Sequence, residues 1–473
     1  MLKKLMKIRF IFILILFLSK SIIQATADTG RPNVLFVIVD DMNGYGFYNK
    51  YPGVKMPYLD KLQKQSVVFD HAYCAVPKCV PSRAAVLSGL PANITGAYLN
   101  ASKPWKQSRV LSEIVSLPEC FKDNGYTTFG RGKIFHNNPP EERFKAMWDN
   151  EVYSGGFKPF PDPENQVQGR FWGIQAFADK EFPDVMNSDA VMEFLNKDHD
   201  KPFFITLGIY RPHTPFTAPQ RFFDMYDLNE IILPPGYKKN DTEDIPEMGK
   251  RLIDKLKRFR TAGTGNEEMW KKMIWAYLAC NTFADWSVGR VIETLDAGKY
   301  ADNTIVVLWS DNGYHCGEKN HWEKSVPWEL GVKTPMLIRI PNMKNAGKVC
   351  SLPVNLIDIY PTLVDYCGID PPSNPLAGKS LRPLLEKPDK FTSKPVVSIL
   401  GKKYTSVRDK RYRYIQYPDG TEELYDHKND NFEHNNLAGK WKYKLIKDKL
   451  ARHVPKIWNS FYTRYESLEK IVK

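Results

Sequence analysis

The sequence predicts an α/β fold around a large, mostly parallel sheet. Three apolar runs rich in β-branched residues each end at polar side chains: NVLFVIVDD (33–41), PFFITLGIY (202–210) and TIVVLWSDNG (304–313). A continuous run of this kind is typical of a strand that is buried on both faces. Helical patterns separate the three runs, and strands that alternate with helices indicate a parallel sheet covered by helices.

Two stretches between the strand runs are interpreted as helices. They are SDAVMEFLNK (188–197) and the long stretch 267–298, which begins EEMWKKMIWAYLAC. In sheets of this class, ligands bind beyond the carboxyl ends of the strands. Four polar residues end the first and third strand runs, and these are Asp40, Asp41, Asp311 and Asn312. We therefore expect the functional site at that edge of the sheet.

A proline-rich segment around 371–390 ends this pattern. Beyond it come four short, aromatic-rich stretches separated by turn residues, which are VVSIL, YTSVRD, RYRYIQY and EELYDH. We interpret them as a small antiparallel sheet, followed by a basic amphipathic C-terminal helix that Pro455 breaks. The sequence thus predicts one large domain over residues 28–385 and a smaller subdomain over 386–473.

The first 27 residues have the features of a cleavable secretory signal peptide. A basic start (MLKKLMKIRF) precedes an apolar core (IFILILFLS), and small residues end the segment at Ala27. The apolar core is too short for a good membrane span. We expect a periplasmic or secreted protein that is not an integral membrane protein.

Charge and cysteine content narrow the classes of function. Removing the five cations of the leader reduces the formal charge from +13 to about +8, which suits an anionic ligand or simply a lysine-rich surface. No segment resembles a nucleic-acid-binding module. The seven cysteines lie far apart without a C-x-x-C pair, which argues against structural zinc and thioredoxin-type chemistry. In an oxidising compartment this odd count leaves at least one thiol unpaired.

The acids at the strand ends suggest a metal site. Adjacent carboxylates repel each other, and one cation bound by both removes that repulsion. Asp40 and Asp41 alone would more often form a turn or a helix cap, but Asp311 and Asn312 after a second strand favour a shared ion. All-oxygen ligands favour calcium or magnesium over zinc.

The stretch CVPSRAAVLSG (79–89) places Cys79 at the N-terminus of a predicted helix. Pro81 suits the first turn, and Gly89 suits the end. Free backbone N–H groups at this end favour an anion and would lower the pKa of a bare thiol. On these grounds alone, Cys79 is either a reactive thiol or a buried structural cysteine.

The pattern C-x-P-S-R-x-x-x-L-[ST]-G resembles the maturation and active-site signature of type I sulfatases. The matching positions are Cys79, Pro81, Ser82, Arg83, Leu87, Ser88 and Gly89. Further blocks resemble the family in order along most of the chain, including PNVLFVIVDDMNGYG, GRGKIFH, IYRPHTPF, WSDNGYHCGEKNHWEKS and ELYDHKNDNFEHNNLA. The spellings GKIFH and RPHTPF are closest to the branch that contains iduronate-2-sulfatase. Asn312 departs from that enzyme, which has histidine there, but matches the usual sulfatase ligand.

The resemblance implies an alkaline-phosphatase-like fold and an active site made by modification of Cys79. In this family a maturation enzyme oxidises the cysteine to formylglycine before the chain folds. The hydrated aldehyde then attacks the sulfur of a sulfate ester. The resemblance also implies one calcium ion, held by residue 79 together with Asp40, Asp41, Asp311 and Asn312.

The resemblance gives roles to five further residues. Arg83 and Lys133 would hold the hydrate and neutralise sulfate charge, and His136 would take a proton when the sulfate is expelled. His213 and Lys324 would bind the sulfate and assist the leaving alcohol. Without the family context, each of these side chains is more often structural or solvated than catalytic.

Several residues near the predicted metal ligands receive no catalytic role. We assign His315, His321 and Glu318 to the wall of the pocket and not to a zinc site. Trp322 and Trp328 are interpreted as core residues more readily than as sugar platforms. The loops at about 140–180 and 230–265 match nothing in the family, and we expect substrate recognition there.

These observations predict an exported, calcium-dependent sulfatase that acts on a sulfated carbohydrate. We expect it to be exo-acting on a terminal sugar, with basic residues such as Arg211 aiding acidic sugars. One alternative is a phosphonate or phosphodiester monoesterase that shares the cysteine signature. The other is a non-catalytic binder of sulfated glycans with an unmodified Cys79.

Overall fold

The computed structural model describes residues 30–47, 51–156, 166–167, 170–175, 177–254, 266–388 and 394–463. The predicted signal peptide and parts of the two loops at about 140–180 and 230–265 lie outside the described residues. Among the residues that are described, none of the helices combines the length and the apolar character that crossing a membrane requires.

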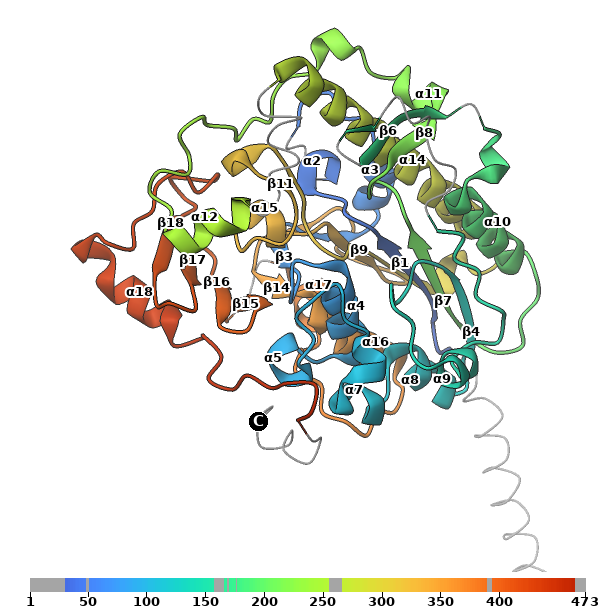
Figure 1. The fold of residues 1–473 in the computed structure, drawn as a ribbon. Helices are drawn as coiled ribbons and strands as arrows, with labels where there is room; N and C mark the ends of the chain where they lie inside the picture. The colour runs from blue at the N-terminus through green and yellow to red at the C-terminus, as the bar shows by residue number, and fades with distance from the viewer. Residues whose placement is uncertain are drawn as a thin grey trace, which may run out of the picture.

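A seven-stranded sheet forms the centre of the described structure. In spatial order its strands are β13 (Val349–Cys350), β2 (Val67–Phe69), β12 (Met336–Arg339), β9 (Thr304–Ser310), β1 (Asn33–Val39), β7 (Phe203–Ile209) and β4 (Thr127–Gly132). The run β9-β1-β7-β4 is parallel, whereas β12 is antiparallel to both of its neighbours. The predicted mostly parallel sheet is therefore confirmed, and its three predicted strands lie side by side at its centre (Figure 1).

Helices cover both faces of this sheet. The side chains of β1 alternate between two hydrophobic cores, so that Phe36 belongs to one core and Val37 to the other. The first core is closed by α4 (Cys79–Ser88), α8 (Leu117–Asp123) and α16 (Ile359–Cys367). The second is closed by α3 (Pro57–Lys64), α10 (Pro183–Leu195) and α14 (Glu267–Ala297). Burial on both faces explains why these strands are continuously apolar.

Shorter elements complete the large domain. The other helices are α2 (Gly44–Phe47), α5 (Ala92–Thr95), α6 (Pro104–Gln107), α7 (Arg109–Glu113), α9 (Glu141–Ala146), α11 (Gln220–Phe223), α12 (Glu247–Asp254), α15 (Glu329–Val332) and α17 (Arg382–Glu386). Small sheets pair β10 (His315–Cys316) with β11 (Trp322–Glu323), β3 (Ala72–Tyr73) with β14 (Val354–Asn355), and β6 (Arg170–Gln175) with both β5 (Gln166–Val167) and β8 (Phe216–Pro219).

The C-terminal part forms the predicted antiparallel sheet. Its four strands, in order, are β15 (Val396–Gly401), β16 (Tyr404–Arg408), β17 (Tyr412–Gln416) and β18 (Glu422–Asp426). Figure 1 shows this sheet at one side of the molecule, with α18 (Lys444–Ala451) outermost. This helix ends at Ala451, four residues before Pro455, which has no N–H group to donate to the Ala451 carbonyl.

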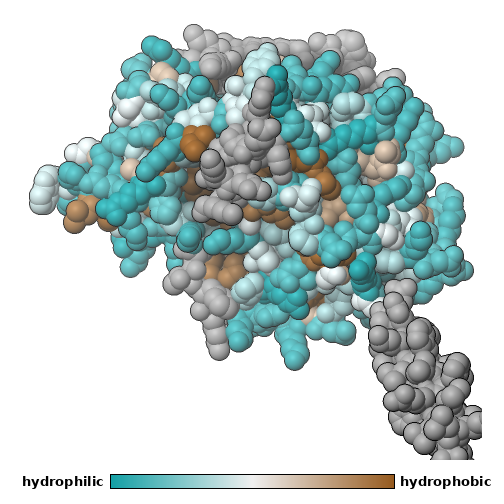
Figure 2. Space-filling view, turned by 90° about the horizontal axis from the view of Figure 1, so that it is seen from below, coloured by the Kyte–Doolittle hydropathy of each residue, from teal (hydrophilic) through white to brown (hydrophobic). Residues whose placement is uncertain are grey.

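One face of the surface is largely hydrophilic, and the cysteines lie inside the fold. Hydrophilic side chains cover most of the coloured part of the face shown in Figure 2, and hydrophobic side chains reach the surface there at a few places. All seven cysteines lie in the described residues, and each of them is buried and free of disulfide bonds.

Candidate active site

The predicted metal ligands meet at the carboxyl ends of β1 and β9. The two strands are parallel neighbours, and Val39 lies in register with Ser310. Asp40 and Asp311, the next residues of the two strands, are therefore neighbours as well. Both carboxylates are completely buried. The predicted ligand residues therefore lie beyond the carboxyl ends of these two strands.

Asp41 turns out of the strand so that its carboxylate reaches the same site. Its φ of 62° lies in the left-handed region. Three bonds hold this bend: Asp41 N–H donates to Asp311 Oδ1 at 3.2 Å, the Tyr277 hydroxyl donates to the Asp41 carbonyl at 2.8 Å, and Met42 N–H donates to Ser310 Oγ at 3.0 Å. The adjacent acids thus meet at one site because tertiary contacts bend the backbone.

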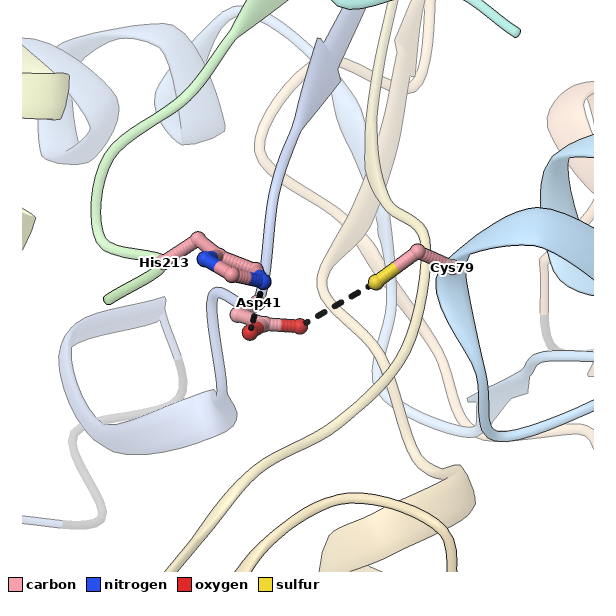
Figure 3. Close-up of side chains that lie close together, drawn as sticks. All are labelled: Asp41, Cys79 and His213. Carbon is pink, nitrogen blue, oxygen red and sulfur yellow. Dashed lines mark hydrogen bonds and ion pairs between the residues drawn. The ribbon is translucent and has the colours of Figure 1, made fainter. Parts of the chain in front are cut away.

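Cys79 is the first residue of α4, as predicted, and the helix ends at Gly89 in the left-handed conformation. The Cys79 Sγ lies 3.8 Å from Asp41 Oδ1, and Figure 3 shows Asp41 between this thiol and His213. The expected lowering of the Cys79 pKa is wrong. Burial raises the pKa of this thiol well above its ordinary value, and the Asp311, Asp40 and Asp41 carboxylates add to the rise. These effects outweigh the helix N-terminus.

Arg83 lies one helical turn after Cys79 and is completely buried. Its Nε donates to Asp311 Oδ2 at 2.8 Å, and its Nη2 donates to Asp40 Oδ1 at 3.2 Å. The remaining Nη1 donates to the carbonyls of Lys133 and Ile134. One guanidinium therefore joins both strand ends to the loop after β4.

Lys133 reaches the site because β4 and β7 approach each other unusually closely. Gly132 has a φ of 76°, and a Cβ at this position would lie 1.9 Å from the Gly208 carbonyl oxygen. Only glycine fits here, and the contact turns the chain so that Lys133 Nζ donates to Asp40 Oδ2. Three residues later, His136 is exposed at the rim of the site. Desolvation and then the Lys133 ammonium lower the pKa of His136, so its ring is neutral at neutral pH.

His213 and Lys324 approach Asp41 from the other side. The Nε2 of His213 lies 3.5 Å from Asp41 Oδ2, and its Nδ1 lies 2.5 Å from the Thr214 carbonyl oxygen. Burial, with the Lys324 ammonium, lowers the pKa of His213 to about 4. Lys324 Nζ donates to Asp41 Oδ2. Burial works against the charge of Lys324, but the Asp41 carboxylate outweighs it and raises the Lys324 pKa.

The ligand set fits a hard cation. Donor atoms of Asp40, Asp41, Cys79 and Asp311 all lie within 4.8 Å of one another. Asn312 Nδ2 donates to Asp41 Oδ1 at 2.8 Å, while Asn312 Oδ1 is buried without a hydrogen-bond partner among the described residues. Burial together with the Asp40 and Asp41 charges raises the pKa of Asp311 to about 7. A cation would satisfy the amide oxygen and relieve the crowding of three carboxylates.

The structure brings nine of the ten predicted site residues into direct contact, and His136 lies at the rim. Two further predictions concerned residues nearby. His315 and His321 are buried, with ring centroids 5.4 Å apart, and neither belongs to a cluster with metal-ligand spacing in the described part of the chain. Trp322 and Trp328 are buried core residues, as interpreted from the sequence.

Arg211 differs from the expectation that it aids acidic sugars. It is buried, and its guanidinium donates to the carbonyl and the hydroxyl of Thr217. Its role is to support the loop that carries His213. Conversely, sequence reasoning missed Tyr277 and Ser310, which hold the bend at Asp41. Tyr277 lies inside a long helix, where no local signal separates it from other core aromatics.

Comparison with known proteins agrees with this geometry. A family model described as "Sulfatase" matches residues 32–369, and a model described as "N-sulphoglucosamine sulphohydrolase, C-terminal" matches residues 317–459. A "Sulfatase" from Formosa agariphila is 37% identical over 454 residues, covering 92% of this chain and 88% of that protein. The iduronate 2-sulfatase of Homo sapiens is 25% identical over 404 residues, covering 74% and 71%.

Solved structures share the fold. A 2-O GAG sulfatase superposes with a TM-score of 0.70 at 26% identity, covering 89% of this chain and 90% of that chain. The phosphonate monoester hydrolase of Silicibacter pomeroyi gives a TM-score of 0.73 at 21% identity, covering 89% and 94%, which shows the fold alone. The predicted alkaline-phosphatase-like architecture is confirmed. Because the first family model spans more than half of the sequence, the chain belongs to the sulfatase family and is a sulfuric ester hydrolase.

Proposed function

We propose that this sulfatase is exported, carries formylglycine at position 79 and calcium at the strand ends, and removes sulfate from a sulfated carbohydrate. The observation that carries the proposal is the cluster of nine polar side chains that includes the buried Asp40–Asp41 pair. Three of these side chains are cations, which is the charge that a sulfate group requires. The Cys79 thiol marks the place that the hydrated aldehyde would occupy.

The calcium ion and the formylglycine would supply the electrophilic and nucleophilic chemistry. Calcium would polarise the sulfate ester, and the hydrate of formylglycine would offer one hydroxyl for attack on sulfur and a second for release of sulfate. The protein's own residues would then orient the ester and move protons. Arg83 would hold the hydrate against Asp40 and Asp311, and Lys133 would neutralise charge on the sulfate oxygens.

The electrostatics support an assignment of roles on the leaving side of the ester. Neutral His213 donates its Nδ1 proton to the Thr214 carbonyl, so its Nε2 is an acceptor. Lys324 remains protonated, because the Asp41 carboxylate raises its pKa. We therefore propose Lys324 as the group that assists the leaving alcohol and His213 as a sulfate-site residue that orients it. On the hydrate side, we propose His136 at the rim as the proton acceptor, because its ring is neutral and therefore has a free acceptor nitrogen.

The burial of the catalytic side chains supports action on a terminal sugar. Cys79 and Asp40 are completely buried, and only 8% of the Lys324 side chain is exposed. A sulfate ester has to reach these buried groups, which is easier for the end of a chain than for its middle. The likeness to a 2-O GAG sulfatase and to iduronate 2-sulfatase supports a sulfated uronate-containing saccharide as the substrate.

One experiment tests the substrate class and the position of the sulfate. Purified protein, made together with a maturation enzyme, is offered dermatan sulfate and carrageenan oligosaccharides with sulfate on the non-reducing terminal sugar or only on internal sugars. We expect release of terminal sulfate and little release of internal sulfate. Equal rates at the two positions would refute the exo-acting assignment.

A second comparison separates the sulfatase from a phosphonate or phosphodiester monoesterase. The same preparation is given 4-nitrophenyl sulfate, a 4-nitrophenyl phosphonate monoester and a phosphodiester. We expect kcat/KM to be highest for the sulfate. The His136→Ala variant should lose turnover, whereas the matched His453→Ala variant, which changes a histidine of the C-terminal subdomain, should keep it.

A further inference from the structure

A second cavity, of about 610 Å³, lies between the large domain and the C-terminal sheet. Its walls include Tyr45, Glu318, Arg408, Lys410, Lys428 and Phe432. None of the described residues that line it belongs to the catalytic cluster. Its volume lies within the range of about 300–1,000 Å³ that is typical of small-molecule sites.

The walls of the second cavity are connected to the catalytic segments. Tyr45 follows Asp41 by four residues, and Glu318 precedes Lys324 by six. The Tyr45 hydroxyl donates to Glu318 Oε1 at 2.6 Å, so these two segments meet behind the active site. The segments that position Asp41 and Lys324 therefore also form part of the wall of the second cavity.

The second cavity has positive charge that the protein does not neutralise. Arg408 and Lys333 pair with the acids of the wall, at 3.4 Å from Glu329 and 3.1 Å from Asp70. In contrast, Lys410 and Lys428 are exposed, and their side chains make no hydrogen bond or ion pair with the residues that the structure describes. Two unpaired ammonium groups at the rim of a cavity favour an anionic ligand.

Phe432 provides an apolar surface beside these lysines. Its ring packs on the backbone of Gly236, where an added Cβ would lie 2.2 Å from the Phe432 Cδ1. The ring also lies nearly parallel to His434, with centroids 5.8 Å apart, and His434 Nε2 contacts the Gly236 carbonyl oxygen at 3.1 Å. Phe432 is nonetheless 38% exposed. A fixed but accessible ring of this kind can stack against the C–H face of a sugar.

We propose that the second cavity binds one sulfated sugar unit of a saccharide chain, separately from the sulfate ester that is cleaved. The sulfate group would lie at Lys410 and Lys428, and the sugar ring on Phe432. This inference rests on the proposed function for the identity of the saccharide. It adds a binding site that raises affinity for oligosaccharides and leaves the chemistry of a small aryl sulfate unchanged.

Binding and turnover variants test this site. The double variant Lys410→Glu/Lys428→Glu and the single variant Phe432→Ala are compared with Lys440→Glu/Lys449→Glu, which makes the same charge change on exposed lysines outside the second cavity. Affinity for sulfated tetrasaccharides of dermatan sulfate and carrageenan is measured by calorimetry in a Cys79→Ala background. Kinetics on 4-nitrophenyl sulfate and on the better tetrasaccharide are measured with Cys79 intact.

We expect both cavity variants to weaken tetrasaccharide binding about tenfold and to raise KM for the tetrasaccharide, because each removes a charge-assisted or stacking contact. Their kinetics on 4-nitrophenyl sulfate should stay at the wild-type level. Wild-type affinity in the cavity variants, or an equal loss in the control variant, would overturn the inference. Loss in the lysine variant alone would overturn the sugar assignment in favour of a simple anion site. If no sulfate ester is cleaved, the proposed function fails, and the calorimetry still decides whether the second cavity binds the saccharide.

Discussion

Arg83 is the residue whose removal should destabilise the active site most. We consider Arg83→Met, which keeps most of the side-chain volume and removes the charge. The change takes charge-assisted bonds from the buried Asp40 and Asp311 carboxylates and a donor from the Lys133 and Ile134 carbonyls. Breaking a buried ion pair by removing one partner costs about 3–5 kcal/mol. We expect the free energy of unfolding to fall by about this amount.

The measurement is urea unfolding, followed by tryptophan fluorescence in the presence of a chelator so that no divalent cation replaces the lost charge. The matched control is Arg382→Met, since Arg382 pairs with Asp365 at 2.9 Å while 44% of its side chain is exposed. That variant should lose less than about 1 kcal/mol. Equal losses in the two variants would show that Arg83 does not hold the strand ends together.

Three further predictions follow from the site and its surroundings. Protein made with a maturation enzyme should carry an aldehyde at residue 79, and this aldehyde should react with hydrazides. The Cys79→Ser variant should bind substrate without turning it over. A wild-type protein that has full activity but does not react with hydrazides would contradict this prediction. After removal of the metal by a chelator, calcium should restore activity and zinc should not. The Asp311→Ala variant should neither bind calcium, measured by isothermal titration calorimetry, nor hydrolyse substrate, measured by rate assays. Burial, with the Lys333 ammonium, lowers the pKa of His71 from 6.5 to about 4. Between pH 6.5 and pH 4 the unfolded chain binds a proton at His71, whereas the folded chain does not. The contribution of His71 to the free energy of unfolding is therefore fully present above pH 6.5 and is lost as the pH falls towards 4. Relative to His71→Gln, the wild type should lose about 1–3 kcal/mol of unfolding free energy between pH 7.5 and pH 4.5, and a pH-independent difference would contradict the assignment.

The strands and the helix at Cys79 could be predicted because their signals are local. A strand buried on both faces needs an uninterrupted apolar run, and residues 33–39 and 304–310 have one. The parallel pairing of these strands then places the acids that follow them side by side. The helix that begins at Cys79 ends where a glycine allows the left-handed conformation. These features depend on residues close in sequence, so the sequence alone is sufficient.

The features that could not be predicted depend on contacts between distant residues. Tyr277 holds the bend at Asp41 from a helix more than 230 residues away. The thiol pKa depends on how many carboxylates surround Cys79, which overcomes the local effect of the helix terminus. Arg211 sits in a motif with His213, but only the structure shows that its guanidinium is buried and donates to Thr217. The bend at Asp41, the pKa of Cys79 and the contacts of Arg211 all depend on neighbours in space that residue type alone does not reveal.

The C-terminal sheet is the clearest example of a feature that depends on contacts between distant residues, because it supports a catalytic segment that precedes it in sequence. The chain just after Lys324 is held by partners from that sheet and the loop behind it. Trp328 Nε1 donates to Glu423 Oε2 at 2.8 Å, and Glu329 N–H donates to Glu433 Oε2 at 2.8 Å. Arg413 also pairs with the Glu329 carboxylate. These contacts are buried, so removing the sheet would leave charges and donors unpaired beside the segment that directs Lys324 to Asp41. The small sheet is therefore part of the active-site support, and a break in sequence pattern near residue 386 does not mark the edge of the catalytic machinery.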